Sequence, residues 1–147
     1  MIELDLRVDD DSWTAISELE RVCEAALVAG ANVASAKGEV SLLLCDDAAM
    51  AELNQTWRGK SGPTDVLSFP AGAEAKPFLG DISVGYGIAL RDAESAGKAL
   101  DQHLSHLLIH GLLHLMGFDH IDDTMAAEME ALEITALASL GWPDPYK

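Results

Sequence analysis

The sequence is poor in basic residues and in aromatic residues. Only 9 Lys and Arg stand against 25 Asp and Glu, so the formal net charge is −16. A surface of this charge repels polyanions, which disfavours broad binding to nucleic acids or to anionic membranes and leaves only a local basic site possible. Aromatic residues make up 5% of the chain. We therefore expect a core built mainly from aliphatic side chains.

Several common signals are missing as well. No apolar run approaches the roughly 18 residues of a membrane span, and the N-terminus lacks the pattern of a signal peptide. We therefore expect a cytoplasmic protein without a membrane partner. The two cysteines, Cys23 and Cys45, have no metal-binding spacing and are expected to be buried free thiols. The sequence also lacks the glycine-rich motifs that bind nucleotide phosphates.

The hydrophobic pattern predicts one domain over residues 1–147, of which 49% are apolar. Period-two and short apolar runs indicate strands at 2–8, 39–45, 64–69 and 80–86, with the second in a central position. Helical patterns cover 12–30, 47–57, 88–97, 100–116 and 123–140, with Gly30 expected to end the first. We expect Glu128, Glu130 and Glu133 to form a solvated face. The interleaved elements predict an α/β (α+β) fold with a small, mixed, four-stranded sheet and about five helices.

All five histidines fall between positions 103 and 120. His110 and His114 are one helical turn apart, so their imidazoles share a face. Gly117 is expected to end the helix in a left-handed conformation and to bring His120 back toward that face. Three nitrogen ligands with an open fourth position are the catalytic arrangement for zinc. We therefore expect one Zn²⁺ per chain, although other divalent ions suit the same ligands.

The spacing H-x-x-x-H-x-x-G-x-x-H is that of the metzincin peptidases, with one difference. Metzincins have a glutamate directly after the first histidine, where it acts as the general base of peptide hydrolysis. Gly111 occupies that position here. The sequence therefore predicts the metal site and argues against ordinary proteolysis.

Other residues could contribute to the same site. His106 and His103 lie one and two turns before His110. We expect them either to support or line the cleft or to be plain surface positions. Asp119 is expected to orient an imidazole or to shape the turn. Ser68 and Asp81 belong to predicted strands that could border the metal.

Three blocks of sequence point to a known family: HLSHLLIHGLLHLMGFDH at 103–120, LNQTWRGKSGPTDVLSFP at 53–70 and LGDISV at 79–84. Together they resemble the YbeY family of bacterial rRNA maturation factors, which are metal-dependent, single-strand-specific endoribonucleases. The resemblance covers essentially the whole chain and implies a small mixed sheet packed with helices. It also implies that His110, His114 and His120 bind zinc and that Arg58 lies in the cleft beside the metal.

The resemblance implies a zinc-dependent endoribonuclease for 3′ end maturation of 16S rRNA and for ribosome quality control. Its partners would be single-stranded rRNA and the small ribosomal subunit with its proteins. The forked guanidinium of Arg58 suits the charge that develops on a phosphodiester, and Lys60 is a weaker phosphate-binding candidate. Two alternatives remain: a ribosome-assembly binding factor with a mainly structural zinc, favoured by the acidic surface, and a metal-dependent hydrolase of another substrate.

Overall fold

A computed structural model describes all residues, 1–147, around one four-stranded sheet. The strands are β1 (Ile2–Val8), β2 (Gly38–Cys45), β3 (Val66–Pro70) and β4 (Phe78–Gly85). Their order is β1-β2-β4-β3. The first three strands in this order run parallel to their neighbours, and β3 runs antiparallel to β4. The sheet is therefore mixed and β2 is central, as the sequence predicted.

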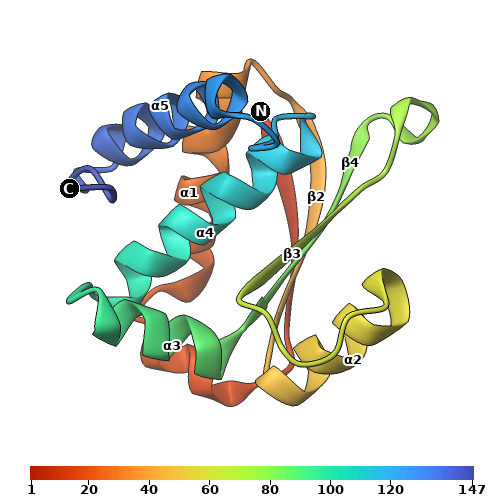
Figure 1. Cartoon of the computed structure of the whole chain (residues 1–147), viewed down its shortest axis with the longest axis vertical. Helices are drawn as coiled ribbons and strands as arrows, with labels where there is room; N and C mark the ends of the chain where they lie inside the picture. The colour runs from red at the N-terminus through yellow and green to blue at the C-terminus, as the bar shows by residue number, and fades with distance from the viewer.

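Five α-helices surround the sheet: α1 (Leu19–Ala34), α2 (Asp47–Arg58), α3 (Tyr86–Ser95), α4 (Leu100–Leu115) and α5 (Asp123–Ser139). Two short 3-10 helices occupy Asp11–Ala15 and Ala73–Ala75. In Figure 1, α1, α4 and α5 gather on one side of the sheet while α2 lies on the other. The predicted fold class is confirmed. None of the helices combines the length and hydrophobicity that a membrane crossing requires.

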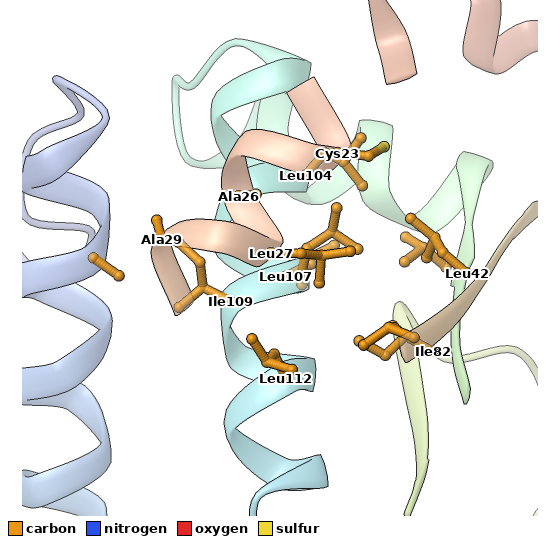
Figure 2. Close-up of a cluster of buried hydrophobic side chains, with 14 of the residues drawn as sticks. Cys23, Ala26, Leu27, Ala29, Leu42, Ile82, Leu104, Leu107, Ile109 and Leu112 are labelled. Atoms are coloured by element: carbon orange, nitrogen blue, oxygen red, sulfur yellow. The ribbon is translucent and has the colours of Figure 1, made fainter. Parts of the chain in front are cut away.

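The main core lies between the sheet and the pair α1 and α4. In Figure 2, Leu27 of α1 and Leu112 of α4 lie on the face of the helices that is turned toward Leu42 and Ile82 of the sheet. Of the 24 residues in this cluster only Trp13 is aromatic, so the core is aliphatic as expected. Each fully buried leucine or isoleucine side chain contributes roughly 1.5–3 kcal/mol to the stability of the fold. The core thus fixes α4 firmly against the sheet.

Both cysteines are free and buried, as predicted. Cys23 belongs to the main core, and Cys45 lies under α2. Burial raises the pKa of each thiol to about 12, so both stay protonated at neutral pH. Neither thiol is therefore a ready nucleophile or metal ligand.

The first helix differs from its prediction at both ends. Residues 11–15 form a separate 3-10 turn capped by Asp10, and α1 begins only at Leu19. The helix then continues through Gly30 to Ala34, so the prediction that Gly30 ends it was wrong. A Cβ atom added to Gly30 would lie 3.0 Å from Cδ2 of Leu112. Gly30 is therefore the point of close approach between α1 and α4, and this packing outweighs its poor helix propensity.

Candidate metal centre and cleft

The three histidines expected to bind a metal come together at the end of α4. His110 and His114 project from its last two turns, and Gly117 follows with φ of 95°. The amide of Phe118 then donates to the carbonyl of Leu113 at 3.0 Å, which turns the chain back on the helix. As a result, one ligand nitrogen from each of His110, His114 and His120 lies within 4.8 Å of the others.

The protonation of these rings fits a cation between them. Nδ1 of His110 lies 2.7 Å from Oε2 of Glu133, and Nδ1 of His114 lies 3.0 Å from the Phe118 carbonyl. Both oxygens can only accept, so both Nδ1 atoms carry the proton. Burial and the neighbouring His110 lower the pKa of His114, which favours the neutral ring. The Nε2 atoms of the two rings are left as the ligand atoms, and they face each other at 3.0 Å. Nitrogen ligands of a tetrahedral zinc ion are about 3.3 Å apart, so the donor set fits that ion.

Glu133 supports this arrangement from α5, and its predicted solvent exposure was wrong. The residue has 0% exposure. Its carboxylate accepts hydrogen bonds from His110 and from Nε2 of His106, both at 2.7 Å, and from the hydroxyl of Tyr146. Burial alone would raise the pKa of Glu133, but these donors hold it down at about 2. Glu133 is therefore a buried anion that fixes the tautomer of His110.

A sequence signal for Glu133 existed. The residue follows Met129 by one helical turn and precedes Leu137 by another, and both of these are buried. A carboxylate on the buried face of a helix normally has partners. His106, predicted to support the ligands, is one of those partners. Tyr146 is another, and it comes from a C-terminal segment that Lys98 holds by donating to the Pro145 carbonyl at 3.2 Å.

The three histidines open into a cleft of about 630 Å³ between α4, β3 and the end of α2. Of the other predicted site residues, Arg58, Ser68 and Asp119 line this cleft. The remaining four do not, and one of these is His106, which contacts Glu133 instead. Lys60 is exposed outside it, and His103 lies nearer the start of α4. Asp81 pairs with Phe69, and both line a separate hollow that contains neither α4 nor the histidines.

Arg58 is the only lysine or arginine in the cleft lining. It is the last residue of α2 rather than part of the following loop, where the sequence had placed it. No carboxylate forms an ion pair with its guanidinium. Gly59 ends α2 with φ of 65°, and buried Asn54 donates to the Gly62 carbonyl at 2.9 Å. Asn54 thus holds the loop behind Arg58, a role that sequence analysis missed.

Comparison with known proteins extends these observations. The family model for endoribonuclease YbeY matches residues 7–141. The chain belongs to the YbeY endoribonuclease family. Curated YbeY endoribonucleases match almost end to end: those of Maricaulis maris at 47% identity and Pseudomonas fluorescens at 46%, each over 99% of this chain and over 92% and 97% of their own lengths. The resemblance noted in the sequence is confirmed, and so is the enzyme class, an endonuclease acting on RNA phosphodiester bonds.

A solved structure shows the same fold. The solution structure of a protein from Thermotoga maritima superimposes with a TM-score of 0.61 at 25% identity, covering 96% of this chain and 92% of that one. The architecture that places His110 and His114 on α4 beside β3 therefore has an experimental counterpart.

The close packing around Gly111 explains why a glutamate does not fit at this position. The residue is buried, and a Cβ atom there would lie 3.1 Å from Oγ of Ser68 and 3.2 Å from Cγ2 of Ile82. The position after the first histidine thus faces the sheet rather than the cleft. Glycine lets α4 sit directly on β3 and β4 and brings the ligands to the sheet edge.

Replacing Glu133 with glutamine should weaken zinc binding. The amide keeps the size of the side chain but removes the charge, and its NH₂ group would meet the N–H of His110 or His106. Loss of a carboxylate that orients a ligand typically costs about 10–100-fold in metal affinity. Competition with a chromogenic chelator measures this change. Glu128→Gln, an exposed change on the same helix, should leave the affinity within about twofold; equal losses in both variants would contradict the role of Glu133.

Proposed function

We propose that the chain is a zinc-dependent, single-strand endoribonuclease that processes the 3′ end of small-subunit rRNA and serves ribosome quality control. Its partners are single-stranded rRNA and the small ribosomal subunit with its proteins, in the cytoplasm. The observation that carries the proposal is one cleft that holds three converging imidazoles and an unpaired guanidinium. Membership of the YbeY endoribonuclease family supports RNA as the substrate.

The side chains of the cleft have separate tasks in this reaction. His110, His114 and His120 would hold the zinc ion, which supplies Lewis acidity and an activated water when bound. Arg58 binds the phosphate by donating two forked hydrogen bonds to its non-bridging oxygens, and it stabilises the charge that gathers there in the transition state. Glu133 keeps a proton of His110 on Nδ1, so that Nε2 is the ring nitrogen left to bind the metal in the cleft.

The charge of the chain is compatible with an RNA substrate because the attraction is local. The formal net charge of −16 disfavours contact with RNA over most of the surface. Within the cleft, Arg58 and a bound divalent ion provide positive charge where the scissile phosphate would lie. This distribution favours binding of one short, single-stranded segment over coating of a long duplex.

Cleavage of end-labelled, single-stranded RNA carrying the small-subunit 3′ end tests the proposal. Wild-type protein should cut the RNA, a chelator should abolish cutting, and added zinc should restore it. Arg58→Ala should lower the rate about 10²–10³-fold, the usual cost of losing a donor to the developing charge. Arg58→Lys keeps the positive charge but loses the forked pair of hydrogen bonds, so its cleavage rate should lie between those of wild type and Arg58→Ala. Lys60→Ala should stay within a few-fold, because Lys60 lies outside the cleft.

Two results would contradict a nuclease function. Cutting that survives the chelator and Arg58→Ala alike would come from a contaminating ribonuclease. Absence of cutting on free RNA and on intact small subunits, in a protein that binds zinc normally, would favour the assembly-factor alternative.

A further inference from the structure

A second group of metal-type ligands lies near the start of α4, apart from the three-histidine centre. It consists of His103, Asp92 of α3 and Asp65, which directly precedes β3. One nitrogen of His103 and one oxygen from each carboxylate lie within 4.8 Å of one another. The segment before β3 and the two consecutive helices α3 and α4 therefore direct two carboxylates and an imidazole at one point.

His103 is the unusual member of this group. Both of its ring nitrogens are buried, and neither has a hydrogen-bond partner. A buried polar group without a partner costs about 1–3 kcal/mol, so such groups are rare in folded proteins. The carboxylates of Asp65 and Asp92 are close enough to be considered as partners, yet neither forms a hydrogen bond or an ion pair with the ring. The geometry leaves a gap between donors instead of a direct bond.

The charge state of the His103 ring also suits a cation between these three side chains. Burial lowers the pKa of His103, with a smaller contribution from His106, so the imidazole is neutral at pH 7. A neutral imidazole offers one lone pair, and the two carboxylates bring two negative charges. Divalent ions such as Zn²⁺ and Mn²⁺ accept this mixture of nitrogen and oxygen ligands. A divalent ion would also neutralise both carboxylates.

We propose that Asp65, Asp92 and His103 bind a second divalent cation, separate from the three-histidine centre. Asp92 is exposed and free to move toward the ion, so small side-chain rotations bring the ligands to coordination distances. Asp65 is already oriented, since one of its oxygens accepts from the Val66 amide at 2.7 Å.

The second ion does not share the reacting phosphate with the first. His103 and His110 are seven residues apart on one helix, which is roughly 10 Å along its axis. Ions that act jointly on one phosphate are about 3.5–4 Å apart. Asp65, however, lines the same cleft as Arg58 and the three histidines. The second ion therefore ties a wall of the cleft to α3 and α4 and removes negative charge where RNA would pass.

Manganese binding to protein loaded with one equivalent of zinc tests this site, because the zinc then occupies the three-histidine centre and leaves Asp65, Asp92 and His103 free. The electron paramagnetic resonance signal of free Mn²⁺ reports how much metal is bound. Wild-type protein should bind one Mn²⁺ per chain, and Asp92→Asn should weaken that binding at least about tenfold. Glu94→Gln removes an equal charge from the same helix outside the cluster and should change the affinity less than twofold. No stoichiometric Mn²⁺ binding, or equal losses in both variants, would overturn the proposal.

Thermal unfolding of His103→Leu provides an independent measurement. Because leucine removes an unpaired polar group, the metal-free variant should be at least as stable as metal-free wild type. Added Mn²⁺ should raise the unfolding temperature of the zinc-loaded wild type but not that of the variant. A variant that still gains stability from Mn²⁺, or that is already destabilised without metal, would overturn the proposal. The zinc content of each protein checks the first centre separately, so failure there is distinguishable.

Discussion

Replacing His114 with alanine should abolish metal-dependent RNA cleavage. The change removes one of three converging nitrogens, and the remaining two leave the ion too weakly held to survive gel filtration. Metal assistance is worth several kcal/mol at a developing phosphoryl charge, so the rate should fall at least about 1000-fold. The measurements are zinc content after gel filtration and the initial rate on single-stranded RNA.

The control for this loss is His114→Asn. The asparagine amide occupies roughly the place of Nδ1 and can still donate to the Phe118 carbonyl, but it offers nothing in place of Nε2. The turn at Gly117 is therefore kept while the ligand is lost. Both variants should lack zinc and activity and should unfold at nearly the same urea concentration as metal-free wild type. Wild-type cleavage rates in either variant would refute a catalytic metal at this position.

Gly111→Glu, which restores the residue of the metzincin peptidases, should destabilise the fold severely and create no peptidase. Even the Cβ atom would crowd Ser68 and Ile82. Overpacking a core position costs about 1–3 kcal/mol, and an unpaired buried carboxylate adds several kcal/mol. The sum is a large part of the roughly 5–15 kcal/mol that stabilises a typical domain. Urea unfolding should therefore show a much lower midpoint or a largely unfolded protein.

Gly111→Ala separates crowding from charge. Alanine adds the same Cβ atom, but it gains up to about 1 kcal/mol of helix propensity over glycine. We expect a net loss below about 2 kcal/mol. Equal stability of the alanine and glutamate variants would mean that the side chain escapes into the cleft, and that the contact between α4 and the sheet is looser than the structure shows.

The local part of the centre could be predicted from the sequence because its rules are local. The spacing of His110 and His114 places them on one helical face, and Gly117 is a residue that tolerates the observed φ of 95°. The strands were recognisable for the same reason, since period-two alternation and short apolar runs are local patterns. Prediction was weaker where a neighbouring element decides, as at Gly30, whose close contact with Leu112 keeps α1 helical.

The supporting residues depend on tertiary contacts and were less accessible. Glu133 is separated from His110 by 23 positions, and no periodicity connects the two. Asn54 acts through a single hydrogen bond to a loop carbonyl. Asp81 was expected near the metal because its predicted strand could border the site, but strand alternation turns its side chain to the other face of the sheet. A sequence can indicate that a strand lies near a site, but it indicates less readily which face of that strand is turned toward the site.

The anchoring of Glu133 has a consequence for protein engineering. Residues 100–120 contain every predicted ligand, which suggests transferring this segment alone to another helical scaffold. The carboxylate that sets the tautomer of His110 comes from α5, and the tyrosine that binds this carboxylate comes from position 146. A grafted segment would contain the imidazoles but not the residues that orient His110. The transferable unit is therefore the pair α4 and α5 with the C-terminal segment, not the histidine motif alone.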